Sequence, residues 1–283
     1  MLQREAVKPL ADKELRALRQ VLVFHEYRYY ILNDPLITDP EYDRLYKLLE
    51  KTEAADPARI TPDSPTQRVA SGLTRSFPAV HHLVPMLSLE NSYNANDLLD
   101  WDRKARELTG LAEIEYCVEP KFDGASISLI YENDLLVRGA TRGDGVEGDD
   151  ITTNIRQIRS VPLSAAFSDY GIEQVEIRGE VMINKENFKK FNATLAEQHL
   201  PPLANPRNAA SGSLHMKDPA EVGRRNLEAF LYHISYYADR ENLDVERGEM
   251  TGTEKAHETK SKKTPLTHSA SLDMLWNLGF RSP

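Results

Sequence analysis

The sequence predicts an α+β fold, in which a small N-terminal helical domain precedes a domain of antiparallel sheets. Residues 12–56 repeat apolar side chains at the helical spacings of three, four and seven residues. From about residue 86 the pattern changes to short alternating runs that turn residues separate, with helical segments between them. Hairpins mixed with helices favour α+β over a doubly wound parallel sheet.

The N-terminal segment predicts two helices that form a hairpin. Asp12 is expected to cap the first helix, and the cluster at 33–35 (Asn-Asp-Pro) to end it. Thr38 and Glu41 have the spacing of a capping box, with Pro40 in the first turn of the second helix. Residues 56–85 hold five prolines, which is typical of an extended linker.

The second part predicts a longer series of elements. In order, we expect a helix at 94–109, strands at 114–118, 125–131, 135–140 and 174–183, a helix at 185–198, a strand at 226–237 and a helix at 268–278. The turn at 132–134 should join two of these strands into a hairpin. Residues 239–263 are rich in charge and predict an exposed connector.

Composition limits the class of protein. The chain has 283 residues, a formal net charge of −9 and one cysteine, Cys117. The charge disfavours a freestanding basic nucleic-acid binder, although it allows a local basic groove. A single cysteine excludes an internal disulfide framework and a multi-cysteine zinc site within these residues. Without a membrane-length apolar run or an N-terminal secretory pattern, a cytoplasmic protein is expected.

The strongest candidate for chemistry is Lys121, within Glu119-Pro120-Lys121-Phe122-Asp123-Gly124. The motif places a lysine in a tight turn between two predicted strands. A lysine acts as a nucleophile only after it loses its proton, which requires burial or a nearby cation. The alternative is a surface lysine in an ordinary Asp-Gly turn. The motif alone leaves both interpretations open.

Two further motifs suit nucleotide binding. Arg142 lies in a glycine-rich loop (ATRGDG) and offers a cation for phosphate or ribose. Glu180 and Arg178 are two residues apart and therefore share one face of a predicted strand, where the carboxylate suits ribose hydroxyls or a metal. The alternatives are a plain glycine-rich loop and a half-exposed strand with cross-strand ion pairs.

The helical hairpin also carries a candidate site. Asp39, Tyr42 and Asp43 share one helical face, and Tyr29 and Tyr30 lie near the end of the preceding helix. Carboxylates with aromatic rings suit a flat cationic ring, and the alternative is a cap beside a core tyrosine stripe.

A loop that enters a small-residue helix at 205–213 provides another candidate. Its helix N-terminus, with Arg207 beside it, suits an anion such as a nucleic-acid phosphate. Close packing of helices through small side chains is the alternative.

Together these motifs carry a resemblance to a known family. The segments HEYRYYILNDPLITDPEYD, PMLSLEN, EPKFDG, ATRGDG, EIRGEV and NPRNAASGSL, in this order, resemble the N-terminal part of bacterial NAD-dependent DNA ligases. The resemblance spans residues 12–283 and is weakest over 239–263. It implies a helical domain at 1–70 that binds the nicotinamide mononucleotide half of NAD. It also implies a nucleotidyltransferase (adenylation) domain at 71–283, truncated before its last two motifs.

The resemblance implies a reaction. In this family a lysine attacks the α-phosphate of NAD, nicotinamide mononucleotide leaves, and AMP passes to a DNA 5′-phosphate before the nick is sealed, as in DNA replication and repair. Magnesium assists, and zinc is expected only in modules beyond this chain. NAD and nicked double-stranded DNA are the expected partners, with no membrane, and we expect a monomer. Because two motif lysines are expected to be missing, we expect weak or absent self-adenylation.

The resemblance also assigns roles by position. Lys121 matches the nucleophile, and Glu119, Ser88, Leu89, Arg142 and Glu180 match the nucleotide pocket. The nicotinamide side corresponds to Tyr29, Tyr30, Asp39, Pro40, Glu41, Tyr42 and Asp43. Arg207 and His215 are expected DNA contacts, although the family usually has Arg or Lys at the position of His215.

Two other functions stay open. The first is an NAD-binding module without turnover, against which the lysine motif argues. The second is an ATP-dependent ligase or capping enzyme, which shares that motif but lacks the helical segment at 12–56.

Overall fold

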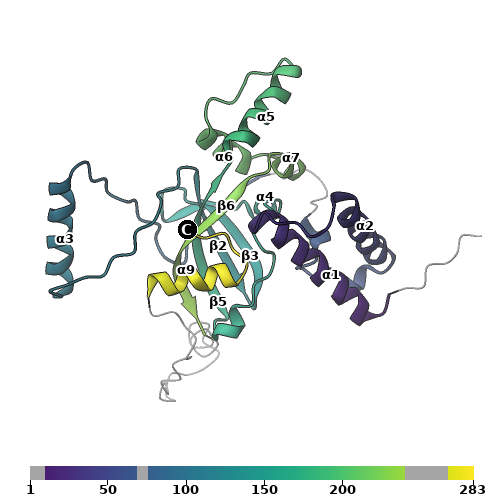
Figure 1. Ribbon diagram of the computed structural model, residues 1–283, viewed down its shortest axis with the longest axis horizontal. Helices are drawn as coiled ribbons and strands as arrows, with labels where there is room; N and C mark the ends of the chain where they lie inside the picture. The colour runs from purple at the N-terminus through teal and green to yellow at the C-terminus, as the bar shows by residue number, and fades with distance from the viewer. Residues whose placement is uncertain (1–9, 69–75, 240–266) are drawn as a thin grey trace, which may run out of the picture.

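A helical domain and a sheet domain lie side by side in the computed structural model, which describes residues 10–68, 76–239 and 267–283 (Figure 1). In the helical domain, α1 (Asp12–Glu26) packs on α2 (Asp39–Ala55). Their shared core consists of Leu15, Leu18, Leu22 and Leu49, all buried. The predicted helical hairpin is therefore confirmed.

The N-termini of the two helices are capped by different residues. Ala11, not Asp12, is the N-cap of α1, and its N–H donates to Glu14 Oε2 at 2.7 Å. Asp12 begins the helix and forms an ion pair with Arg59 at 2.9 Å, so its predicted capping role is wrong. At α2, Glu41 accepts from the N–H and the hydroxyl of Thr38, at 2.9 and 2.8 Å. The predicted cap is present there.

The linker after α2 is more structured than its prolines suggest. It contains two 3₁₀ turns, Pro57–Arg59 and Pro65–Arg68, and then strand β1 (Ala79–His81). β1 pairs antiparallel with β4 (Glu147–Asp149), a pairing that local sequence does not reveal because the partners lie far apart in the chain. The predicted domain boundary at residues 70 and 71 lies outside the described residues, as does the charged segment beyond residue 239.

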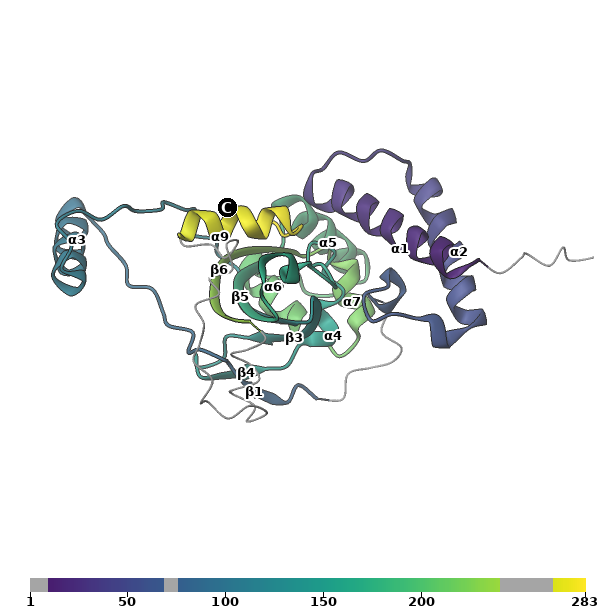
Figure 2. The ribbon, with the colours of Figure 1, turned by 90° about the horizontal axis from the view of Figure 1, so that it is seen from below.

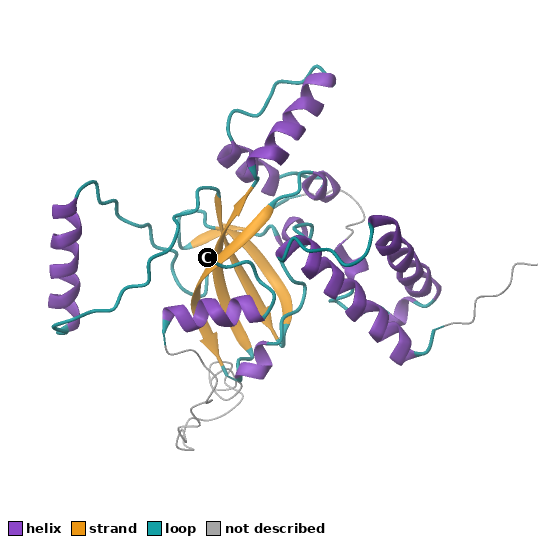
Figure 3. Cartoon of the chain, in the orientation of Figure 1, coloured by secondary structure: helices purple, strands orange, loops and turns teal. Residues whose placement is uncertain are grey.

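The sheet domain is built on a four-stranded antiparallel sheet in the order β3-β2-β5-β6 (Figure 3). The strands are β2 (Ala125–Glu132), β3 (Leu135–Thr141), β5 (Gln174–Met182) and β6 (Glu228–Ala238). Asn133 and Asp134, with φ of 48° and 67°, form the two-residue turn between β2 and β3. A turn with two left-handed residues matches the twist of the strands, so the predicted hairpin is confirmed.

The two faces of this sheet are unlike. Val175, Ile177 and Val181 of β5 belong to the main apolar core, to which α4 (Thr152–Ile155), α6 (Pro206–Leu214) and α7 (Pro219–Arg224) contribute. Because side chains alternate along a strand, Glu176, Arg178 and Glu180 occupy the opposite face. The sheet thus has an apolar face and a polar face, and the polar face carries the candidate chemistry.

Two more α-helices lie against or beside the sheet. α9 (His268–Asn277) lies along β6 (Figure 2). It is followed by Phe280, whose ring packs against those of Tyr131 and Phe167. α5 (Lys185–Glu197) and a 3₁₀ turn (Phe167–Tyr170) lie at the periphery. Within the described residues, none of the helices is long and apolar enough to cross a membrane.

α3 (Ala95–Thr109) stands away from the sheet on two extended arms (Figure 1). Asn94 caps it by accepting from the N–H groups of residues 96 and 97, at 2.9 and 3.1 Å. The predicted strand at 114–118 lies in one of these arms and is wrong, because it has no ladder partner among the described residues. Alternating residues describe an extended segment, but a neighbouring strand is needed to make it part of a sheet.

Two arginines, one buried and one partly exposed, join the two domains. Arg68 donates to the backbone carbonyls of Arg156, Ile158 and Val161 of the sheet domain, at 3.1, 3.4 and 3.0 Å. From the sheet domain, Arg159 donates in the opposite direction to the buried Glu26 of α1 at 2.6 Å. These contacts cross between the domains and fix how they face each other.

Candidate functional site

A pocket of about 340 Å³ opens in the helical domain next to the sheet domain. Its lining consists of His25, Glu26, Tyr29, Tyr30, Pro35, Leu36, Ile37, Asp39, Tyr42, Asp43 and Arg159. Five of the residues that the sequence suggested for a cationic ring thus line one cavity. Pro40 and Glu41 lie in the first turn of α2 and are not part of this lining.

Local backbone structure explains how these side chains meet. After α1 the chain continues as a π-helical turn, Tyr27–Ile31, in which the wider turn allows the adjacent Tyr29 and Tyr30 both to reach the pocket. Their ring centroids are 4.8 Å apart. Asp39, Tyr42 and Asp43 reach it from α2 because residues three and four apart share a helical face.

The floor of the pocket is a buried ionic network around Glu26. The carboxylate accepts a hydrogen bond from the Tyr42 hydroxyl at 3.0 Å and from Arg159 at 2.6 Å. Arg68 lies 3.4 Å from its second oxygen. Burial raises the pKa of Tyr42, which the charge of Glu26 raises further, so the phenol stays neutral and donates. Burial also raises the pKa of Tyr30.

The pocket therefore combines three kinds of group. Tyrosine rings form its walls, the carboxylates of Asp39 and Asp43 are exposed at its edge, and Arg159 supplies one cation. Rings and carboxylates favour a flat cation, and a guanidinium favours a phosphate. The arrangement suits a ligand that carries both charges.

Sequence reasoning missed several residues of this lining. His25 and Glu26 lie four residues before Tyr29 and Tyr30, so helical spacing was a signal that would have found them. Pro35, Leu36 and Ile37 belong to the loop between the helices. Arg159 comes from the other domain, and nothing in the local sequence links it to this pocket.

Lys121 lies in the turn that precedes β2, at the polar face of the sheet. Its side chain is exposed. The next residue, Phe122, stacks on Phe230 of β6 with ring centroids 4.5 Å apart. The N–H of Gly124 donates to Glu180 Oε1 at 3.0 Å, and Ser126 donates to the other oxygen at 2.9 Å. The turn is thus held from both sides, while the side chain of Lys121 is exposed to solvent.

Gly124 is required by a close approach of two backbones. A Cβ at this position would lie 2.2 Å from the carbonyl oxygen of Val181. Any larger residue would displace the turn that carries Lys121. The motif's glycine therefore has a packing role as well as a turn role.

Glu180 and Arg178 share the polar face, as their spacing predicted, but both are buried rather than half-exposed. Arg178 donates to Glu176 Oε1 at 3.2 and 3.1 Å and to the carbonyl of Val84. The segment before α3 covers this face, since the N–H of Leu83 also donates to Glu176 at 2.7 Å. Sequence reasoning missed Glu176, although it lies two residues from Arg178 on the same strand.

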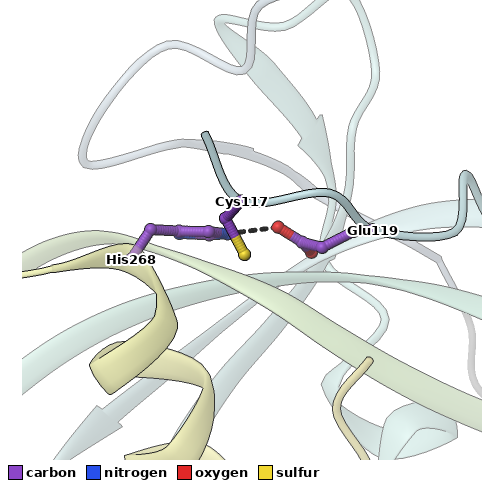
Figure 4. A group of neighbouring side chains, drawn as sticks. All are labelled: Cys117, Glu119 and His268. Carbon is purple, nitrogen blue, oxygen red and sulfur yellow. Dashed lines mark hydrogen bonds and ion pairs between the residues drawn. The ribbon is translucent and has the colours of Figure 1, made fainter. Parts of the chain in front are cut away.

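The arm between α3 and Lys121 meets α9 at Glu119. His268 Nε2 is 2.5 Å from Glu119 Oε1, and Cys117 lies beside this pair (Figure 4). His268 was missed because about 150 residues separate it from Glu119 in the chain. Because Glu119 is paired with His268, its carboxylate would have to release this histidine before it could make the predicted contact with adenine.

The glycine-rich loop positions Arg142. Gly143 and Gly145 have φ of 56° and 98°, and Asp144 closes the loop by accepting from the N–H groups of Val146 and Glu147 at 2.8 and 3.0 Å. Arg142 is exposed. Ser88 and Leu89 lie on the arm that leads to α3, where both are exposed. The structure gives the two arm residues no place in the pocket of the helical domain.

Two family models match the chain. The first, described as the NAD-dependent DNA ligase adenylation domain, matches residues 74–271. The second, described as the DNA ligase-like, N-terminal NAD+-binding domain, matches residues 8–70. The chain belongs to the NAD-dependent DNA ligase family. The resemblance seen in the sequence is confirmed, as is the order of a helical domain before an adenylation domain.

Curated relatives named DNA ligase agree. The protein from Persephonella marina is 54% identical over 273 residues, which are 96% of this chain and 36% of the relative. That from a Sulfurihydrogenibium species is 55% identical over 99% of this chain and 38% of its own length. The protein from Aquifex aeolicus is 50% identical over the whole chain and 36% of its own length. The chain thus spans little more than a third of these ligases.

The residues expected to contact DNA have partners inside the adenylation domain. Arg207, at the start of α6, forms an exposed ion pair with Asp123 at 2.9 Å and so ties that helix to the turn of Lys121. His215 Nε2 lies 3.0 Å from Asp149 Oδ2, and its ring packs edge-on against Phe77. Each side chain would have to break its contact with an aspartate before it could bind a DNA phosphate.

Proposed function

We propose that the chain binds NAD, with the nicotinamide half in the pocket of the helical domain, and that Lys121 is the nucleophile that takes up AMP. The observation that carries this proposal is the pocket, in which tyrosine rings, carboxylates and Arg159 meet. We also propose that the helical domain comprises residues 1–70 and the adenylation domain residues 71–283.

The chemistry of the pocket matches nicotinamide mononucleotide. The nicotinamide ring of NAD is a flat cation, which Tyr29 and Tyr30 would contact through their ring faces. Asp39 and Asp43 would compensate its positive charge, and Arg159 would bind the phosphate that leaves with it. Contacts that strengthen as charge develops on the departing phosphate would favour cleavage between the two halves of NAD.

The proposed step is an attack by the Lys121 amine. After Lys121 loses its proton, its nitrogen attacks the phosphorus of the adenylyl half. A P–N bond forms, the P–O bond to nicotinamide mononucleotide breaks, and that nucleotide leaves with the oxygen and its electron pair. The exposed guanidinium of Arg142 is the cation that we propose to favour the neutral amine and to contact phosphate or ribose.

The remaining predicted contacts belong to the adenylyl half. We propose that Glu119 binds the adenine, that Ser88 and Leu89 close over the nucleotide, and that Glu180 holds the turn of Lys121 beneath it. Nicked double-stranded DNA is the proposed final acceptor of AMP, with Arg207 and His215 as candidate phosphate contacts.

We propose that magnesium binds through the phosphates of the substrate. Among the described residues, the side chains grouped as metal ligands are Cys117, Glu119 and His268, and their sulfur and nitrogen donors do not suit magnesium. Phosphate oxygens of NAD and water are the ligands that magnesium prefers. When bound there, it would neutralise charge on the transferring phosphate.

Calorimetry tests the pocket. We expect Tyr42→Ala and Asp43→Ala each to weaken binding of NAD and of nicotinamide mononucleotide by about tenfold or more, because each loses a contact worth at least 1.4 kcal/mol. AMP binding should be unchanged. Asp169→Ala, which removes an exposed carboxylate outside the pocket, is the control. Equal affinities for NAD in all four proteins would remove the nicotinamide assignment.

Intact-mass spectrometry after incubation with NAD and magnesium tests the nucleophile. A gain of one AMP in the wild type and none in Lys121→Ala supports the proposed attack. An adduct that persists in Lys121→Ala would contradict it. Binding of NAD without any adduct would favour the second candidate, an NAD-binding chain without turnover, which the intact pocket of the helical domain also supports.

A further inference from the structure

Three side chains of different chemistry meet beside the polar face of the sheet. Cys117 and Glu119 lie on the same side of an extended arm because they are two residues apart. His268 reaches them from the first turn of α9. One ligand atom from each, namely a sulfur, an oxygen and a nitrogen, lies within 4.8 Å of the other two. Figure 4 shows the three side chains pointing toward a common centre.

This donor set is typical of zinc. Zinc binds thiolate, imidazole and carboxylate at about 2.0–2.3 Å in a tetrahedral arrangement, which separates neighbouring ligand atoms by about 3.3–3.8 Å. The imidazole and carboxylate atoms here are 2.5 Å apart and would open slightly, and the sulfur would move inward. Side-chain rotation is sufficient for both changes because Cys117 is exposed and the other two are partly exposed.

We propose that Cys117 Sγ, Glu119 and His268 Nε2 form a three-ligand site for a zinc-type divalent cation, with the fourth position left to water. The thiol loses its proton to become a ligand, and coordination to the cation replaces the direct contact between the histidine and the carboxylate. Two anionic ligands balance the charge of the cation. Hard ions such as magnesium do not compete well for sulfur and nitrogen.

The site has a consequence that rests on the proposed function. Glu119 is the proposed adenine contact, and a carboxylate that coordinates a cation is no longer available to the adenine. Zinc and the adenylyl half of NAD therefore compete for one side chain. The occupied site acts as an inhibitory site for nucleotide binding.

Cobalt(II) is a spectroscopic probe that tests the site without any activity measurement. Binding to the full chain should produce a near-ultraviolet thiolate-to-cobalt charge-transfer band and the intense visible bands of a four-coordinate ion. Because Cys117 is the only cysteine in the sequence, the charge-transfer band can come from no other residue. Zinc should displace cobalt and abolish both bands.

Variants make the test specific. Cys117→Ser should lose the charge-transfer band, and His268→Ala should weaken cobalt binding by about 10- to 100-fold or more, since even outer-shell changes have effects of that size. His81→Ala, which removes an exposed histidine of β1, should bind as the wild type does. Circular dichroism of each variant checks that it is folded. A wild type without the thiolate band, or a His268→Ala that binds equally well, would overturn the site.

Competition with AMP separates this proposal from the proposed function. We expect saturating AMP to weaken cobalt binding about tenfold or more, if the two share Glu119. Cobalt bands that AMP does not affect would overturn the inhibitory role. NAD affinity measured in the presence of a chelator tests the proposed function alone, since no metal is then bound.

Discussion

The guanidinium of Arg159, a residue of the sheet domain, donates a hydrogen bond to the buried carboxylate of Glu26 in the helical domain, with 2.6 Å between Nη1 and Oε1. The same carboxylate accepts from Tyr42, which lines the pocket. One buried anion thus connects the domain interface to the proposed nicotinamide site. A substitution at the interface should therefore change the position of Tyr42 in the pocket.

We expect Arg159→Ala to lower the free energy of unfolding by about 1–3 kcal/mol, because it leaves Glu26 buried with less compensation. Arg68 still lies 3.4 Å from this carboxylate, which limits the loss. Urea denaturation measures the change. In a Glu26→Gln background the same substitution should cost less, since Arg159 then has no buried carboxylate to compensate. Additive effects of the two substitutions would contradict the coupling, and Arg103→Ala on the exposed face of α3 should change nothing measurable.

We expect Arg178→Ala to be among the most destabilising substitutions in the sheet and to lower the free energy of unfolding by about 3 kcal/mol or more. Glu176 is fully buried and would lose its charged partner, and the arm over the polar face would lose its bond to the Val84 carbonyl. Denaturant unfolding measures the loss. Glu176→Gln together with Arg178→Ala should recover part of it, and a double variant as unstable as Arg178→Ala would argue against an unpaired charge as the cause.

Substitution by alanine should change the stability of the protein in opposite directions at two glycines. Gly124→Ala places a Cβ against the Val181 carbonyl and should destabilise the protein by about 1–3 kcal/mol. Gly212→Ala lies in α6 with open space around it and should stabilise the protein by about 0.5–1 kcal/mol, because alanine favours the helix. Thermal unfolding of both variants is sufficient. If Gly124→Ala were neutral, the close approach beneath Lys121 would not constrain the turn.

His233 should make stability depend on pH. Burial lowers its pKa below the ordinary 6.5, and Arg178 and His268 lower it further, against the opposing charges of Glu119 and Glu176. The unfolded chain therefore binds the proton first as the pH falls. The free energy of unfolding is therefore highest above about pH 6.5. It decreases as the pH falls from there to the pKa of His233 in the folded state.

His233→Gln should flatten this dependence. The measurement is the urea midpoint between pH 5 and pH 8, with the exposed His199→Gln as the control. An unchanged slope in His233→Gln would show that another group causes the acid sensitivity.

Local patterns in the sequence predicted most elements because their causes are local. The hairpin at Asn133 and Asp134, the capping box of Thr38 and Glu41 and the leucine stripe of α1 each follow from residues within a few positions of one another. Helical spacing likewise placed Asp39, Tyr42 and Asp43 on one face. The motif order was sufficient to identify the family.

Tertiary structure decided what depends on distant partners. The strand expected at 114–118 lacks a neighbour in the described chain, whereas β1 exists only because β4 pairs with it. Arg159 lines a pocket of the other domain, and His268 meets Glu119 across about 150 residues. Hydrophobic periodicity specifies which face of an element is buried, but long-range packing alone determines which charged groups meet there. The sequence by itself determined most elements and the family, and the tertiary structure decided the composition of each site.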